Sequence, residues 1–274
     1  MLLKITEKCS LGCTHCVNNA KPNGKHMSFE VLKDTLDFIR KTNTYQHIII
    51  TGGEPTEHPE FVKMAKEIIN FSKSINSLTV VTITTNGFWI LQNPEIAKEI
   101  ACSGNESTMV SFQVSTDSRY YPKPLLDKTK RIWREPGFIL CEECVAQIYP
   151  LGRAKENNYP TDRISSHCFN IRAISKQLKA IDSNGNNSNN GYDYYDHSLT
   201  FEDIVRTLVS ANKFCTPTIR INGDICLGES DLCKTCSNIY KTDNEIVDDI
   251  LQFKCHTCDH INNNLPEKYK QFLE

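Results

Sequence analysis

Regular alternation of strand-like and helix-like segments is the feature of this sequence that most constrains its fold. Four short apolar or β-branched segments predict buried strands: Leu2–Thr6, His47–Thr51, Leu78–Thr84 and Met109–Ser115. Three intervening segments predict helices: Met27–Lys41 with Ser28 as its N-cap, a segment that begins at Pro59, and Asn93–Ala101. Strands and helices that alternate in this way indicate βα units around a parallel sheet.

We therefore expect an α/β fold, a partial (β/α)6 barrel that resembles part of a TIM barrel. Polar signatures follow the predicted strands at the point where each strand ends: Cys9–Cys16, Thr51–Pro55, Thr84–Gly87 and Ser115–Asp117. Ligand sites of parallel α/β folds lie at the carboxyl ends of their strands. The four segments therefore predict a single site at one end of the sheet.

The second half of the chain carries weaker signals. They predict a helix over Lys123–Glu135, an interrupted strand over Gly137–Tyr149, a helix over Thr200–Asn212 and a β-hairpin with an Asn-Gly turn within Thr218–Leu227. Asp182–Gly191 is an Asn-rich polar stretch, typical of a loop or linker. We expect three regions: a partial barrel over 1–165, a linker over 166–192, and a small cysteine-rich α+β extension over 193–274.

The 274 residues include 13 cysteines, most of them in closely spaced groups. The groups are Cys9-x3-Cys13-x2-Cys16, Cys141-x2-Cys144, Cys233-x2-Cys236 and Cys255-x2-Cys258. The amino-terminal segment reads as a strand rather than a secretion signal, so the clustered thiols favour metal ligands in a cytoplasmic protein over disulfides. A net charge of −2 and the lack of any apolar run of about 20 residues favour neither a nucleic-acid nor a membrane partner.

The first cysteine group offers three thiolates, Cys9, Cys13 and Cys16, within eight residues. A four-iron four-sulfur (4Fe-4S) cluster takes four ligands, so three cysteines leave one iron open to another ligand. An open coordination position marks a site of chemistry rather than a structural one. From the spacing alone, a structural zinc site that borrows a distant ligand is the alternative, and His15 is a further candidate ligand.

Two of these motifs together resemble the radical S-adenosylmethionine (radical SAM) superfamily over roughly the first 155 residues. The cysteine triplet follows the first strand and Gly-Gly-Glu-Pro at 52–55 follows the second, as in that family. The resemblance implies a 4Fe-4S cluster on Cys9, Cys13 and Cys16, and S-adenosyl-L-methionine (SAM) as cofactor. It implies reductive cleavage of SAM to a 5′-deoxyadenosyl radical that abstracts hydrogen from a substrate, with flavodoxin or ferredoxin as electron donor.

The resemblance also implies which loops surround SAM. Two glycines at 52–53 would allow the backbone to approach the cofactor closely, and carbonyls or the carboxylate at 54 would accept from its ammonium group. The loop after the third predicted strand resembles the family's Thr-Asn-Gly turn, and the loop after the fourth resembles the polar end of the family's fourth strand. A later Gly-Arg-Ala element also resembles one found in the family. His15 would pack near the adenine. The residues expected to bind SAM are Gly52, Gly53, Glu54, Pro55, Thr85, Asn86, Ser115, Asp117 and Gly152.

The carboxyl-terminal cysteines predict a second metal site. Their double Cys-x2-Cys spacing suits a zinc ribbon, whereas a resemblance to the SPASM or twitch extensions of radical SAM enzymes implies an auxiliary iron–sulfur cluster. The expected ligands are Cys233, Cys236, Cys255 and Cys258, with Cys215 and Cys226 as alternates. Zinc is the alternative metal.

The motifs leave the substrate open. A ribosomally made peptide is the first expectation, because cysteine-rich extensions of this kind are frequent among peptide-modifying members of the family. A small-molecule dehydrogenase is the second. The alternative from another class is a zinc-binding interaction protein without catalysis. Cys102 is expected to pack in the core, and Cys141, Cys144 and Cys168 have no assigned role.

Overall fold

The computed structural model describes residues 1–42, 47–75, 79–115, 137–141, 152–158, 217–226, 228 and 233–252. In the first half of the chain the elements are β1 (Leu2–Thr6), α1 (Phe29–Thr42), β2 (His47–Gly52), η1 (Pro55–Glu57), α2 (Phe61–Lys73), β3 (Thr79–Thr85), α3 (Phe88–Gln92), α4 (Pro94–Ala101) and β4 (Thr108–Ser115). Then come β5 (Phe138–Cys141), α6 (Gly152–Glu156), β6 (Thr218–Ile219), β7 (Asp224–Cys226), β8 (Thr235–Asn238) and α9 (Asp243–Gln252).

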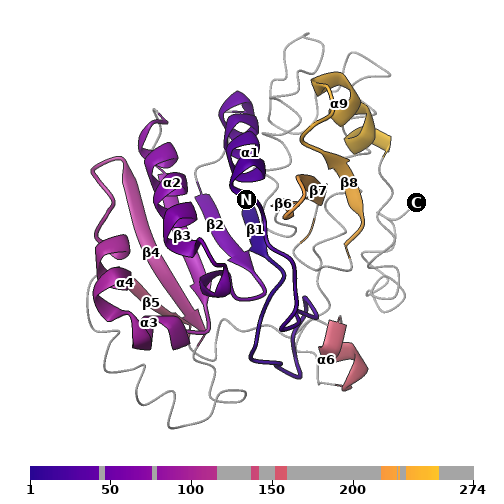
Figure 1. Cartoon of the computed structure of the whole chain (residues 1–274). Coiled ribbons are helices and arrows are strands. Elements are labelled where there is room, and N and C mark those ends of the chain that lie inside the picture. Colours follow the sequence, from indigo (N-terminus) through magenta and orange to yellow (C-terminus); the bar gives the residue numbers. More distant parts are fainter. Residues whose placement is uncertain are drawn as a thin grey trace, which may run out of the picture.

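The strands form one sheet in the order β5-β4-β3-β2-β1-β6-β7-β8 (Figure 1). Neighbours from β5 to β1 are parallel, as the alternation of strands and helices predicted. The α/β class is therefore confirmed. In the described part of the chain the sheet stays open, with β5 and β8 at its two edges.

The two faces of the parallel strands have different environments, as the side chains that alternate along β2 show. Ile48 and Ile50 are fully buried in the hydrophobic core, where α2 and α4 pack against the neighbouring strands. Ile49 and Thr51 point to the opposite face, where they line a cavity. Because side chains alternate along a strand, one short segment supplies both the core and the floor of the site.

The hairpin predicted near the carboxyl end is confirmed. β6 and β7 pair antiparallel, and Gly223 takes φ 83° in the turn between them. β6 also pairs in parallel with β1, Leu2 opposite Thr218 and Leu3 opposite Ile219, so the hairpin continues the main sheet. This continuation was not predicted. The expected region boundaries at 165 and 192 lie outside the described residues.

The predicted helix starts are right at α1 and α4 and wrong at α2. The Ser28 hydroxyl accepts from the Val31 N–H at 3.2 Å, as expected of an N-cap. Helix α2 begins at Phe61, because the chain around Pro59 is held in a turn in which the Phe61 N–H donates to the His58 carbonyl at 3.0 Å. The short elements η1 and α3 were not expected.

Several predicted elements fall outside the described residues: the helices over Lys123–Glu135 and Thr200–Asn212 and the linker over Asp182–Gly191. Of the interrupted strand over Gly137–Tyr149, the described part forms β5. Among the helices that are described, none has the length and apolar character needed to cross a membrane.

Candidate functional site

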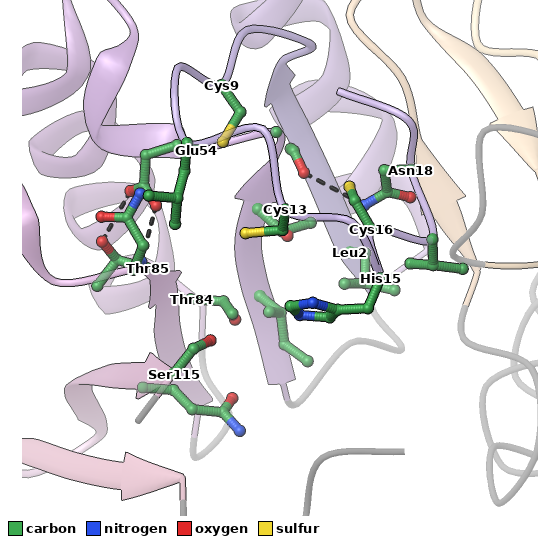
Figure 2. Close-up of a pocket in the computed structure, with 18 of the residues that line it drawn as sticks. Leu2, Cys9, Cys13, His15, Cys16, Asn18, Glu54, Thr84, Thr85 and Ser115 are labelled. Carbon is green, nitrogen blue, oxygen red and sulfur yellow. Dashed lines mark hydrogen bonds between the residues drawn. The ribbon is translucent and has the colours of Figure 1, made fainter. Parts of the chain in front are cut away.

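A cavity of about 540 Å³ opens at the carboxyl ends of β1 to β4. The structure brings together the four loops in which the sequence placed a single site. Side chains of the cysteine loop lie on one side of the cavity, and Thr84 and Ser115 lie below them in Figure 2. The predicted residues that line it are Cys9, Cys13, His15, Cys16, Gly52, Gly53, Glu54, Thr85, Asn86 and Ser115.

The cysteine loop leaves β1 and folds back along its own start. The Glu7 N–H donates to the Lys25 carbonyl at 2.8 Å, and the Cys9 N–H donates to the Lys21 carbonyl at 3.0 Å. Gly12 takes φ 64°, a left-handed conformation that glycine adopts at no steric cost, and so permits the turn between Cys9 and Cys13. The loop thus carries its three thiols at the mouth of the cavity.

Two thiols of this loop, those of Cys9 and Cys13, are buried enough to resist ionisation when no metal is bound. Burial raises the pKa of Cys9 to about 11, and burial also raises the pKa of Cys13. A metal centre binds thiolates, so loading it must release these protons. In the described part of the chain, no three His, Cys, Asp or Glu side chains converge closely enough to hold a single metal ion.

The glycines of the second loop line the cavity and also pack closely against protein. A Cβ atom at Gly52 would lie 2.1 Å from the Thr6 carbonyl oxygen, and one at Gly53 would lie 2.4 Å from the Lys8 carbonyl oxygen. The Gly53 N–H donates to Thr6 and the Glu54 N–H donates to Lys8, both at 2.8 Å. Both glycines are therefore required where the second loop packs against the start of the cysteine loop.

Glu54 joins two of the loops that surround the cavity. Its Oε1 accepts from the Thr85 hydroxyl at 2.7 Å and the Thr56 hydroxyl at 2.6 Å, and its Oε2 accepts from the Asn86 N–H at 2.7 Å. The residue is only 3% exposed, and burial raises the pKa of its carboxyl although these hydrogen bonds lower it. Protein donors reach both oxygens, but a carboxylate has about four acceptor sites and the described residues give Oε2 one hydrogen bond, so Glu54 can accept a further donor from the cavity that it lines.

Of the other predicted SAM contacts, two are not in the cavity lining and one lies outside the described residues. Pro55 is buried in η1, and it is not among the described residues that line the cavity. Gly152 packs against the cysteine loop, and its neighbour Arg153 lines the cavity in its place. Asp117 lies outside the described residues.

Two residues of the site were missed by the reading of the sequence. Arg153 donates its main-chain N–H to the Cys16 carbonyl and its Nη1 to the Ala20 carbonyl, each at 3.0 Å. Asn18 donates to the Gly52 carbonyl at 3.3 Å and accepts from the buried Lys4 Nζ at 2.8 Å. The Gly-Arg-Ala element pointed to the first of these residues, whereas no sequence signal pointed to Asn18.

The described carboxyl-terminal cysteines lie in and beside the hairpin. Cys226 is fully buried on β7, and Cys236 packs against the hydrophobic core with its Sγ 3.9 Å from the Asp249 carbonyl oxygen. The other proposed ligands Cys215, Cys255 and Cys258 lie outside the described residues, as do Cys144 and Cys168. Cys102 is exposed, so the expectation that it packs in the core is wrong. It is the C-cap residue of α4.

Comparisons with known proteins agree with the motifs. The model of the Radical SAM superfamily matches residues 3–136. The GTP 3′,8-cyclase of Haemophilus influenzae (strain 86-028NP) is 30% identical over 119 residues, which cover 42% of this chain and 32% of the cyclase. The mycofactocin maturase MftC of Mycobacterium ulcerans (strain Agy99) is 28% identical over 114 residues, 41% of this chain and 28% of the maturase. The chain thus spans about a third of the length of these curated relatives.

A solved structure shows a similar fold over most of the chain. The crystal structure of BtrN in complex with AdoMet and 2-DOIA superimposes with a TM-score of 0.51 and covers 98% of this chain and 87% of BtrN. The sequence identity is 10%, so the likeness concerns the fold alone.

Proposed function

Since the chain belongs to the radical SAM superfamily through residues 3–136, we propose that its cavity holds a 4Fe-4S cluster on Cys9, Cys13 and Cys16 together with SAM. The observation that carries this proposal is the meeting of three thiols and four strand-end loops around one cavity of about 540 Å³. Binding pockets for small molecules have volumes of roughly 300–1,000 Å³. The donor set fits the cluster, because all three proposed ligands are thiols.

Different residues around the cavity are proposed to bind different parts of SAM. Main-chain carbonyls of Gly52 and Gly53 or the carboxylate of Glu54 are the proposed acceptors for its ammonium group, since all three residues line the cavity. Polar side chains at the ends of β3 and β4, including Thr84 and Ser115, are the proposed contacts to its ribose. When bound, the cluster supplies the electron for reductive cleavage of SAM to a 5′-deoxyadenosyl radical.

The apolar part of the wall serves to exclude water from that chemistry. Leu2 and Ile49 reach into the cavity from β1 and β2, and Val17 reaches in from the cysteine loop. A reactive intermediate formed in the cavity is thus shielded from competing reactions with solvent.

We propose that the substrate is a peptide, and a small molecule is the second candidate. The maturase match supports the first and the cyclase match supports the second. Transfer of deuterium from a labelled candidate into 5′-deoxyadenosine decides between them. If a small metabolite transfers label and candidate peptides encoded beside the gene do not, the peptide proposal is wrong.

A second metal site on the carboxyl-terminal cysteines remains part of the proposal. The proposed ligands are Cys233, Cys236, Cys255 and Cys258, with Cys215 and Cys226 as alternates. The metal is proposed to be an auxiliary iron–sulfur cluster rather than zinc. About four irons per chain that persist after removal of the first three cysteines would support this cluster. One bound zinc without iron would contradict it.

The test of the main proposal is simultaneous replacement of Cys9, Cys13 and Cys16 by Ala, with Cys102→Ala as the matched control because Cys102 is exposed and outside the cavity lining. Protein purified without oxygen is analysed for iron and sulfide, reduced with dithionite and incubated with SAM. We expect the triple variant to contain about four irons fewer per chain and to release no 5′-deoxyadenosine, while the control matches the wild type. A triple variant that still releases 5′-deoxyadenosine overturns the proposal.

A further inference from the structure

The segment that starts with α6 is held tightly against the cysteine loop. The Arg153 N–H donates to the Cys16 carbonyl at 3.0 Å, and the Asn157 side-chain amide donates to the Thr14 carbonyl at 2.9 Å. Gly152 takes φ 56°, and a Cβ atom there would lie 2.6 Å from the Cys16 oxygen and 2.7 Å from the Val17 oxygen. The contact thus requires glycine and involves the loop at several points.

Arg153 adds a charge to this contact. Its Nη1 donates to the Ala20 carbonyl at 3.0 Å, while its side chain lines the cavity beside Cys13 and Cys16. Its Nε is buried and has no hydrogen-bond partner in the described part of the chain.

The position of this charge is unusual within the cavity. Among the described residues that line it, Arg153 is the one lysine or arginine. The facing ionisable groups are the thiols of the cysteine loop, His15 and the carboxyl of Glu54. A guanidinium group stays protonated at any pH at which the protein is folded, so it supplies a permanent positive charge. Because Arg153 and Cys13 line the same cavity, that charge faces the space in which the cluster is proposed to bind.

We propose that Arg153 is a positioning residue for the cluster: it fixes the cysteine loop between Cys16 and Ala20, and its charge beside Cys13 favours the reduced state of the cluster. This inference rests on the proposed function, because it concerns the same cluster. Reduction adds one electron, taken from a one-electron donor, and no bond is formed or broken. The added negative charge interacts favourably with a nearby cation, and net charge near an iron–sulfur cluster is one of the factors that set its reduction potential.

The test is a potentiometric titration of the cluster, followed by electron paramagnetic resonance in the absence of SAM. The variants are Arg153→Met, which removes the charge, Arg153→Lys, which keeps it, and Asn157→Ala, which removes a neutral contact of the same segment. We expect Arg153→Met to lower the equilibrium constant for reduction at least tenfold, which corresponds to 59 mV for one electron. Arg153→Lys and Asn157→Ala should change it less than threefold.

The outcomes separate the inference from the proposal on which it rests. A wild-type protein that holds no reducible cluster refutes the proposed function. If the cluster's equilibrium constant for reduction changes less than threefold in Arg153→Met, as in the control variants, the inference alone is refuted, even if that variant binds SAM more weakly. If Arg153→Met fails to retain iron, Arg153→Lys decides. Native iron content and potential in the lysine variant support the role of the charge, and loss of the cluster there as well overturns it.

Discussion

Replacement of Gly53 by Ala tests whether the second loop and the cysteine loop form one packed unit. The new Cβ atom would lie 2.4 Å from the Lys8 carbonyl oxygen and 2.9 Å from the Ala20 Cβ. Ordinary contact begins at 3.4 Å. The two backbones would therefore have to separate by about 1 Å, because atoms at shorter distances repel each other steeply.

The cost of this separation follows from the hydrogen bonds that cross the contact. A shift of about 1 Å weakens the bonds from Gly53 to Thr6 and from Glu54 to Lys8, both now 2.8 Å long. Each such bond contributes about 0.5–1.5 kcal/mol, and a buried group left without a partner costs about 1–3 kcal/mol. We therefore expect Gly53→Ala to lower the free energy of unfolding by about 2–4 kcal/mol.

The assay is urea unfolding of the metal-free chain, together with iron content after anaerobic reconstitution. Gly12→Asn is the matched control, because a Cβ atom there meets nothing within 4 Å and Asn tolerates the left-handed conformation at φ 64°. The control should lose less than about 1 kcal/mol and bind iron normally. A Gly53→Ala protein that is as stable as the control and binds as much iron would refute the packing argument.

Three further predictions concern single interactions. Glu54→Gln exchanges one acceptor for a donor, so a buried donor such as the Asn86 N–H loses its partner; urea unfolding should show a loss of about 1–3 kcal/mol, and an unchanged midpoint would contradict this. Because burial raises the pKa of Cys9 to about 11 from 9.0, the metal-free fold favours the protonated thiol. The free energy of unfolding of the metal-free protein should therefore fall as pH rises between these two values, and this decrease should be smaller in Cys9→Ser. Lys41 and Asp243 form an ion pair of 3.2 Å with side chains 64% and 50% exposed. Lys41→Ala should therefore change the free energy of unfolding, measured with urea, by less than about 0.5 kcal/mol, and a larger loss would contradict the solvent screening expected there.

The parallel strands and the place of the site were predictable because both depend on local patterns. Runs such as His47–Thr51 are too apolar and too β-branched to be stable elsewhere than in a sheet interior. The carboxyl ends of parallel strands share one edge, so motifs that follow successive strands must meet. The loops that begin at Cys9 and Gly52 illustrate this rule.

Contacts between distant segments were not predictable in the same way. Strand β6 pairs with β1 through two residues, too few to give a pattern in the sequence. The bond from Arg153 to Ala20 spans 133 positions and ends on a main-chain carbonyl, a group that every residue has. The glycines at 52 and 53 were recognised as special, but their neighbours Thr6 and Lys8 could be identified only from the folded chain.

The place of β1 between β2 and β6 has a consequence for biosynthesis. All five residues of β1 are buried, and the strand leaves the ribosome well before its partner β6. Its second neighbour arrives only when Thr218 and Ile219 have been translated, so until then one edge of β1 is unpaired. An apolar, unpaired edge strand is a template for aggregation. Polypeptides released before that point would expose it permanently, and nascent chains would depend on rapid elongation or chaperones to protect it.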